Sequence, residues 1–219
     1  IREICDRYNV LMIVDEVVTG FGRTGTPFGV DHFGVVPDIM ATGKGLSSGY
    51  TPIAATVVSD RIYDAIYEKQ THYVHGHTYG GNPLSCAVAL AVQDYIVEHD
   101  LITNCRRMGD LMLDQLQPLL ECPIVGAVRG KGLLTGVEFV KDKDTREPFP
   151  VDERVTASVV DRVFERDVLI MPGAPGLVDG VAGDHIALSP PFTIDEQQVD
   201  TTVTAVTEAV LATARDLGY

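Results

Sequence analysis

The sequence is poor in basic residues and has no long apolar run. Among its 219 residues, 17 are Lys or Arg and 31 are Asp or Glu, which gives a formal net charge of −14. Because so acidic a surface repels phosphate backbones, nucleic acid is not expected as a partner. No stretch reaches the roughly 18 consecutive apolar residues that a membrane-spanning helix needs, so a membrane is not expected as a partner either.

Cysteine is scarce, and its four residues are scattered at positions 5, 86, 105 and 122. None of them forms a Cys-X-X-Cys pair or has the spacing of metal ligands. Scattered cysteines in a chain of this size are typical of small buried side chains in a reducing compartment. We therefore expect a cytoplasmic protein without disulfides.

Three neighbouring histidines, His72, His75 and His77, could suggest a metal site. However, no Asp, Glu or Cys lies between the first and the last of them, and glycines surround the segment. A cluster of histidines without further ligands is weak evidence for a metal. We expect a loop at an interface here, and no bound metal.

The first residues have the spacing of a helix. Ile1, Ile4, Cys5 and Tyr8 fall on one helical face, and the sequence does not begin with methionine. We therefore expect the sequence to open inside an amphipathic helix and to be a piece of a longer protein. Its composition, with 45% hydrophobic and 22% charged residues, is that of a globular domain.

The first half of the chain has the pattern of a parallel sheet covered by helices. The apolar run 10–14 predicts a strand buried on both faces, and 39–41 and 53–58 predict two more strands. Asn82 and Pro83 predict a helix start, because asparagine caps a helix and proline suits its first position.

The second half predicts a smaller α/β unit. We expect a helix over 101–116, a hairpin over 124–140, a helix around 155–164, and short strands at 168–171 and 185–189. Asp195 and Gln198 form a possible capping box for the last helix. The predicted fold is therefore α/β, with a large domain over 1–102 and a small C-terminal domain over 103–219.

Lys44 is the first candidate for chemistry. It lies between Gly43 and Gly45, directly after a short predicted strand. A partly desolvated lysine amine has a lowered pKa and can attack carbonyl carbons, which would make Lys44 a Schiff-base former. The local sequence also fits a surface lysine in a glycine turn or a lysine that binds phosphate.

Asp15 is the second candidate, because it ends the most hydrophobic predicted strand. Ligands of open α/β sheets bind at the carboxyl ends of strands. An aspartate there can also cap a helix or anchor a loop. Asp15 and Lys44 together favour one shared site, since pyridoxal 5'-phosphate (PLP) needs an amine for its aldehyde and a carboxylate beside its pyridine nitrogen.

Four ordered blocks of the sequence resemble the class III (omega) aminotransferases. They are IVDEVVTGFGRTG at 13–25, PDIMATGKGLSSGY at 37–50, HGHTYGGNP at 75–83 and VRGKGL at 128–133. The resemblance spans nearly the whole chain. It implies a PLP-dependent transferase of fold type I, represented here by part of the large-domain, mainly parallel sheet and a small C-terminal α/β domain.

The resemblance also implies residue roles. Lys44 would form the Schiff base with PLP and move the substrate proton, Asp15 would pair with the pyridinium nitrogen, and Val17 would pack on the ring face. Thr78 would reach the cofactor phosphate of the neighbouring subunit. The family usually forms homodimers or dimers of dimers with active sites at the subunit interface.

The activity implied is transamination between an amine donor, such as an omega-amino acid, and a 2-oxo acid such as pyruvate. A PLP-dependent aminomutase or decarboxylase of the same class, or an inactive truncated fragment, remains an alternative. Two features depart from the family. No Gly/Ser phosphate-binding loop precedes Ile13, and the segment 179–185 has no arginine that could bind a substrate carboxylate.

Overall fold

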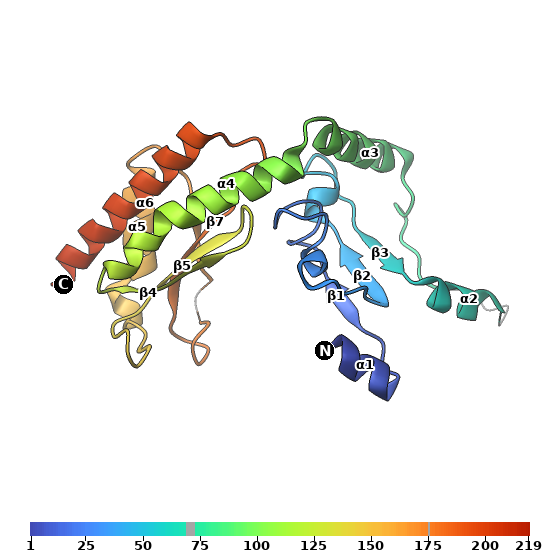
Figure 1. The fold of residues 1–219 in the computed structure, drawn as a ribbon, viewed down its shortest axis with the longest axis horizontal. Coiled ribbons are helices and arrows are strands. Elements are labelled where there is room, and N and C mark those ends of the chain that lie inside the picture. The colour runs from blue at the N-terminus through green and yellow to red at the C-terminus, as the bar shows by residue number, and fades with distance from the viewer. Residues whose placement is uncertain (69–72, 175) are drawn as a thin grey trace. The chain divides into compact units, whose positions relative to one another are not determined.

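The computed structural model describes residues 1–68, 73–174 and 176–219. The chain forms two compact units, over 1–103 and 104–219 (Figure 1). Whether these units correspond to the large and small domains of a PLP enzyme, divided after residue 102, stays a prediction.

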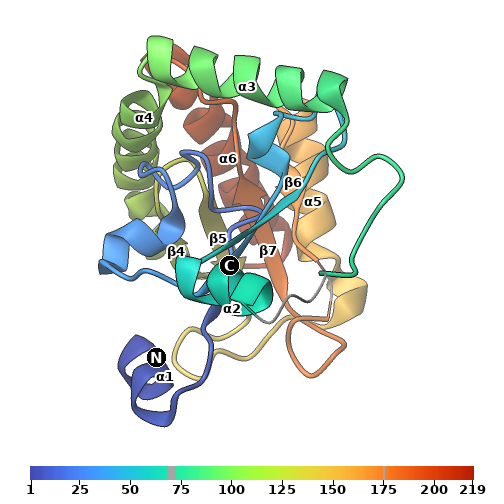
Figure 2. The ribbon, with the colours of Figure 1, turned by 90° about the vertical axis from the view of Figure 1, so that its right-hand side faces the viewer.

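The first unit is built around a three-stranded sheet of order β1-β2-β3. Figures 1 and 2 show α3 at one end of this sheet and α1 and α2 at the other. Two short 3₁₀ helices, η1 and η2, follow β1 and β2. The elements are α1 (Arg2–Tyr8), β1 (Ile13–Asp15), η1 (Gly29–Phe33), β2 (Ile39–Thr42), η2 (Lys44–Leu46), β3 (Ala55–Val58), α2 (Asp60–Glu68) and α3 (Pro83–Glu98).

The strand directions confirm the predicted parallel pairing only in part. β1 and β2 run parallel, with Ile13 beside Ile39 and Asp15 beside Ala41. In contrast, β3 runs antiparallel to β2. The expectation that the segment 10–14 is buried on both faces is wrong, because β1 lies at an edge of the sheet and Ile13 is 67% exposed.

Local sequence determines the start of α3 as expected. Asn82 Oδ1 accepts hydrogen bonds from the backbone amides of Leu84 (3.0 Å) and Ser85 (3.2 Å), and Pro83 occupies the first helical position. The cap satisfies amides that have no partner inside the helix. The predicted helix at the start of the sequence is also present, as α1.

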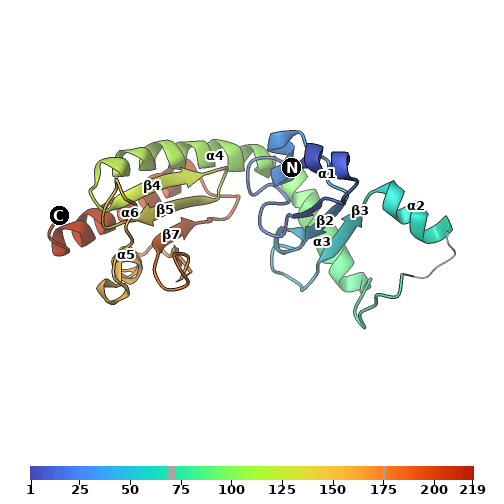
Figure 3. The ribbon, with the colours of Figure 1, turned by 90° about the horizontal axis from the view of Figure 1, so that it is seen from below.

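The second unit is an antiparallel sheet of order β4-β5-β7-β6, packed against helices. Figure 3 shows β4, β5 and β7 side by side. Its first helix, α4, starts in the last residues of the first unit. The elements are α4 (Leu101–Leu116), η3 (Gln117–Glu121), β4 (Val125–Gly130), β5 (Thr135–Phe139), η4 (Val151–Glu153), α5 (Val155–Phe164), β6 (Met171–Pro172), β7 (Asp184–Leu188) and α6 (Glu196–Asp216).

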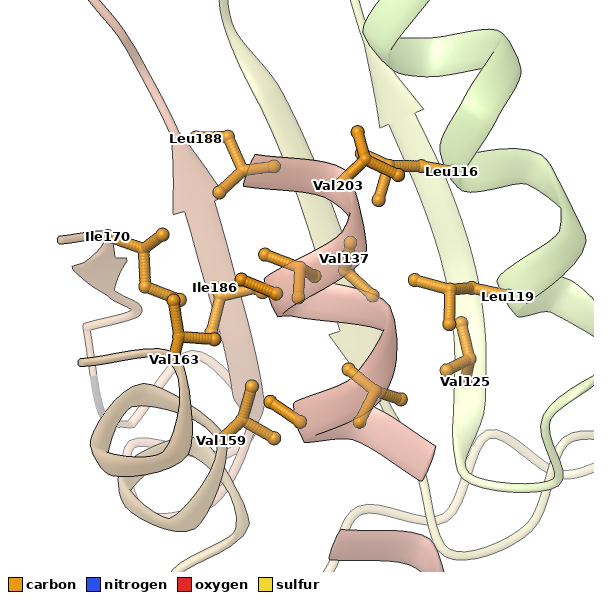
Figure 4. Packing of buried hydrophobic residues seen from close by; sticks show 14 of the residues in the cluster. Leu116, Leu119, Val125, Val137, Val159, Val163, Ile170, Ile186, Leu188 and Val203 are labelled. Carbon is orange, nitrogen blue, oxygen red and sulfur yellow. The ribbon is translucent and has the colours of Figure 1, made fainter. Parts of the chain in front are cut away.

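A single apolar core fills the space between this sheet and α4, α5 and α6 (Figure 4). The predicted capping box of α6 is present, with Asp195 and Gln198 each bonding to the backbone amide of the other. The predicted stripe of that helix is buried, at Val199, Val203, Val206 and Val210. The predicted strand over 168–171 is shorter than expected, since β6 has only two residues.

All four cysteines lie in the described part of the chain, and none of them is in a disulfide. Cys105 and Cys122 are buried in the second unit, whereas Cys86 is exposed. Within the described ranges, no helix has the length and apolarity to cross a membrane.

Candidate functional site

The carboxyl ends of β1 and β2 bring two of the predicted site residues to one edge of the first sheet. Asp15, the last residue of β1, lies beside Ala41 of β2, and the Glu16 amide donates to the Ala41 carbonyl at 2.9 Å. Lys44 follows Ala41 by three residues. Because parallel strands end at the same edge, Asp15 and Lys44 flank one short stretch of that edge.

Lys44 occupies an unusual backbone conformation. Its φ is +38°, in the left-handed region that lysine rarely adopts, and it begins η2. The residue is exposed, and no described residue forms an ion pair or a side-chain hydrogen bond with it. Non-glycine residues held in this region occur preferentially at functional sites.

A second Gly-Lys-Gly string at 130–132 shows that the context of Lys44 is distinctive. Lys131 lies in the turn between the antiparallel strands β4 and β5, where its amide donates to the Leu134 carbonyl at 3.0 Å. The same tripeptide thus forms a hairpin turn in the second unit, whereas in the first unit it follows a parallel strand.

Asp15 and Val17 are held by the turn that follows β1. Asp15 Oδ1 accepts a hydrogen bond from the Val17 amide at 2.9 Å, while no described residue donates to its Oδ2. A Cβ atom built on Gly43 would lie 3.8 Å from Val17 Cγ1. The Val17 side chain therefore lies next to the residue that precedes Lys44.

Glu16 is a buried acid whose importance the sequence did not reveal. It is 1% exposed, and its carboxylate accepts the backbone amides of Gly29 (2.9 Å) and Val30 (2.8 Å). The Thr19 hydroxyl also donates to it. These bonds tie the loop after β1 to the start of η1. A carboxylate that accepts several hydrogen bonds can be buried because its charge is compensated.

The loop after β1 packs closely against η2. A Cβ atom on Gly45 would lie 3.2 Å from Phe21 Cβ, and one on Gly20 would lie 2.7 Å from the Glu16 carbonyl oxygen. Phe21, like Lys44, has a positive φ, of +56°. Glycine at position 45 therefore permits the close approach of the two loops, and glycine at position 20 lets the loop after β1 turn back on Glu16.

Thr78 is not brought to this edge by any contact in the described part of the chain. It lies exposed in the segment between α2 and α3, where the His77 carbonyl accepts from the Gly80 amide at 2.9 Å. In the same segment the rings of His75 and His77 are 4.9 Å apart. His72 lies outside the described residues, which contain no group of three His, Cys, Asp or Glu able to hold a metal.

A cluster of charged side chains lies at the amino end of β2, at the other end of this strand from Lys44. Asp38 accepts hydrogen bonds from the Met12 amide (2.8 Å) and from the guanidinium groups of Arg2 (2.9 Å) and Arg61 (2.8 Å). The Met12 amide, and then Arg2, lower the pKa of Asp38 below its usual value. The same contact with Asp38 raises the pKa of Arg2.

Comparison with known sequences places the chain in a family. The profile of the aminotransferase class III family matches residues 1–210. An uncharacterized aminotransferase of Bacillus subtilis, YodT, is 38% identical over 218 residues, which are 99% of this chain. An adenosylmethionine-8-amino-7-oxononanoate aminotransferase of Nitratidesulfovibrio vulgaris is 39% identical over 97% of this chain. The chain spans 49% and 38% of the lengths of these two relatives.

Solved structures agree with the sequence relatives. A transaminase from a marine Virgibacillus superposes with a TM-score of 0.91 at 39% identity, over 99% of this chain and 48% of that one. An amine transaminase from an uncultivated Pseudomonas species, described as PLP-bound, superposes with a TM-score of 0.89 at 40% identity, over 96% of this chain and 46% of that one. With a family profile over residues 1–210 and a matching fold, the chain belongs to the class III aminotransferases, a family of PLP-dependent fold-type I enzymes.

Proposed function

We propose that this chain carries the lysine-bearing part of a transaminase that moves an amino group between an amine donor and a 2-oxo acid such as pyruvate. The observation that carries the proposal is the placement of Asp15 and Lys44 at the ends of two adjacent parallel strands. The two residues supply an amine and a carboxylate at one sheet edge, and the apolar side chain of Val17 lies next to Gly43, which precedes Lys44.

The residues at this edge fit PLP by their chemistry. Lys44 has no protein partner among the described residues, so its Nζ is available for the cofactor aldehyde. Asp15 Oδ2 likewise has no donor from the described chain and can accept a hydrogen bond from a pyridine N–H. Val17 offers a methyl surface for a ring. When bound, PLP supplies an electron sink for charge that develops on the substrate carbon.

The protein's own chemistry in this proposal is proton transfer by Lys44. In the first half-reaction, Lys44 Nζ would take a proton from the substrate carbon that bears the amino group. In the second half-reaction, the same nitrogen would give a proton to the carbonyl carbon of the 2-oxo acid as that carbon receives the amino group. The Asp15 carboxylate would accept a hydrogen bond from the pyridine N–H of bound PLP, which would support the electron demand of the ring.

The proposal includes a second copy of the chain. Thr78 would bind the cofactor phosphate of a neighbouring subunit in a homodimer or a dimer of dimers. Its exposure supports this role, as does the absence, among the described residues, of a hydrogen bond between Thr78 and the Lys44 loop. The small-molecule partners are an amine donor and a 2-oxo acid acceptor.

The test uses Lys44→Ala in the protein expressed from its complete gene. Borohydride reduction after loading with PLP should fix the cofactor to Lys44 in the unsubstituted protein, as peptide mass spectrometry would show. We expect Lys44→Ala to lose both this attachment and alanine formation from pyruvate with any amine donor.

Lys131→Ala is the matched control, because Lys131 also lies between two glycines. It should retain the attachment and the activity. Cofactor fixed at Lys131, or retained covalently in Lys44→Ala, would contradict the proposal. Attachment at Lys44 without transfer to any 2-oxo acid would instead favour an aminomutase or a decarboxylase.

A further inference from the structure

The turn that begins at Lys44 leaves two of its backbone carbonyls without a partner among the described backbone amides. Within the turn, the Gly43 carbonyl accepts the Leu46 amide at 2.9 Å, and the Lys44 carbonyl accepts the amides of Ser47 (3.2 Å) and Ser48 (3.0 Å). The next two carbonyls, of Gly45 and Leu46, have no such local amide partner. Backbone carbonyls shielded from water need a donor from elsewhere.

Gln93 of α3 supplies that donor to both carbonyls. Its side-chain amide nitrogen, Nε2, lies 3.1 Å from the Gly45 oxygen and 3.0 Å from the Leu46 oxygen. The two N–H groups of one amide thus complete the hydrogen bonding of the turn. Gln93 is half-buried and reaches across 47 and 48 residues of sequence.

The same helix holds the loop at a second, more distant point. The Ser85 hydroxyl lies 2.8 Å from the Thr51 hydroxyl, and the Ser47 hydroxyl donates to the Thr51 carbonyl at 2.6 Å. Figure 1 shows α3 at the end of the sheet where this loop lies. Two side chains of α3 therefore bind this loop. Gln93 bonds to it next to Lys44, and Ser85 bonds to it at Thr51.

The turn also contacts the loop after β1. Gly45 packs against Phe21, so the turn is in contact with the loop after β1 as well as with α3. These contacts matter because Lys44 has a φ of +38°, a conformation that persists only where the surroundings enforce it. Without the bonds from Gln93, the turn could relax and the lysine backbone would move.

We propose that Gln93 is a positioning residue that fixes the turn carrying Lys44 and thereby sets where the Lys44 amine meets its electrophile. This inference rests on the proposed role of Lys44 as the residue that bonds to PLP. Gln93 does not touch the reacting atoms; it acts through the carbonyls of Gly45 and Leu46. Small misplacements of a reacting group cost large factors in rate, so loss of Gln93 should slow attachment.

The test measures the rate at which Lys44 bonds to added PLP, in protein expressed from its complete gene and freed of cofactor. Borohydride quenching at successive times and peptide mass spectrometry follow the attachment without any turnover. Gln93→Met keeps the length of the side chain but removes both donors. We expect attachment to slow about tenfold or more. Gln93→Glu places a carboxylate against the carbonyl oxygens of Gly45 and Leu46. Because these oxygens repel a carboxylate, attachment should slow further.

Ser85→Ala is the control, because it removes a bond of α3 to the same loop at the point distant from Lys44. Its attachment rate should stay within about twofold of the unsubstituted rate. Gln93→Asn, which shortens the chain by one methylene but keeps the amide, should fall between Gln93→Met and the original. This variant provides a measurement even where the other substitutions reduce folding, which thermal unfolding would reveal.

The outcomes separate this inference from the proposed function. Attachment at Lys44 at the original rate in both Gln93→Met and Gln93→Glu would overturn the positioning role and leave the proposed function intact. An equal slowing of attachment in Ser85→Ala would also overturn the positioning role, because a general loosening of the loop would then explain the result. Absence of attachment at Lys44 in the unsubstituted protein would overturn the proposed function itself.

Discussion

Asp15 and Glu16 are adjacent acids whose carboxylates lie in different surroundings. Asp15 is exposed at the strand end and uses one oxygen to accept the Val17 amide. Glu16 is buried, and both of its oxygens accept hydrogen bonds from residues 13 and 14 positions away. The outer acid is therefore free to bind a ligand, whereas the inner acid organises the loop that surrounds it.

We expect Glu16→Ala to loosen the loop after β1. The amides of Gly29 and Val30 would lose their acceptor, and a shielded amide without a partner costs about 1–3 kcal/mol. The amides of these two residues should therefore exchange with deuterium at least tenfold faster in the variant. Hydrogen exchange followed by mass spectrometry of peptides from this loop measures the change.

Glu98→Ala provides the control for this experiment, because Glu98 is an exposed glutamate at the end of α3. In Glu98→Ala, hydrogen exchange in the loop after β1 should keep the rate of the unsubstituted protein. Unchanged exchange at Gly29 and Val30 in Glu16→Ala would mean that the loop does not depend on the buried carboxylate.

The sequence points to candidate site residues at strand ends, but not to the residues that support them. Asp15 and Lys44 follow apolar runs, and the rule for ligands in α/β sheets directs attention to such positions. Glu16 and Gln93 bind backbone groups far away in the sequence, so no local pattern shows which groups they contact. The Asp-Glu tandem was a signal for Glu16, because its second acid follows a strand end directly. Gln93 carried no signal of its own.

At the scale of elements, Asp38 joins four segments of the first unit. Its carboxylate binds Arg2 of α1, Arg61 of α2 and the amide of Met12 before β1, while Asp38 itself precedes β2. Ser59, between β3 and α2, donates its amide to the Asp38 carbonyl at 2.9 Å. These contacts place one ionised carboxylate where α1, α2 and the sheet meet.

The lowered pKa of Asp38 predicts a pH-dependent contribution to stability. A carboxylate whose pKa is lower in the folded state stabilises the fold above about pH 4, the usual pKa range of aspartate, and this contribution is lost as the pH falls below it. Asp38→Asn should therefore lower the urea midpoint at pH 7, and the difference from the unsubstituted protein should shrink toward pH 3. Asp94→Asn, on the exposed side of α3, should show no such trend. A difference that is constant across pH would contradict this role.

Gly109 allows α4 to lie directly on the turn between β4 and β5. A Cβ atom at this position would lie 2.2 Å from the carbonyl carbon of Gly132, which is backbone and cannot move aside. Helix propensity alone predicts that Gly109→Ala stabilises the protein by about 1 kcal/mol. We expect the opposite, a loss of about 3 kcal/mol, because the helix must move off the turn. The free energy of unfolding from urea titration measures the difference.

Gly136→Ala is the control for Gly109→Ala within the same unit. A Cβ atom on Gly136 would lie 3.6 Å from the Ile186 oxygen, an ordinary contact. This variant should change the free energy of unfolding by less than about 1 kcal/mol. Equal effects of the two substitutions would show that close packing at Gly109 does not determine stability.

The elements that the sequence predicted well are those whose signals are local. The cap at Asn82, the capping box at Asp195 and the valine stripe of α6 all depend on residues a few positions apart. The direction of β3 and the exposure of Ile13 depend on how strands are ordered in the sheet. Apolar runs show that a strand is present but do not fix its neighbours, so these two features could not be predicted.

At the scale of the whole molecule, the buried apolar side chains are distributed unequally between the two units. Every member of the large core cluster lies between Cys105 and Ala214. Among the described residues of 1–103, the buried apolar side chains are Ala89 and Ile96. In the same part of the chain, large apolar side chains are exposed on several elements, among them Ile4, Ile13, Leu84 and Leu90.

This distribution predicts that the two units differ in independent stability. A fragment of residues 100–219 retains the complete α4 and the whole core cluster, so it should fold alone and unfold in one cooperative transition in calorimetry. A fragment of residues 1–99 lacks a comparable core, so it should bind a hydrophobic dye and show no cooperative transition. Val137→Asp in the fragment of residues 100–219 is the control, because a charge in that core should abolish the cooperative transition. Cooperative unfolding of 1–99, or its absence in 100–219, would show that burial within each unit does not govern its folding.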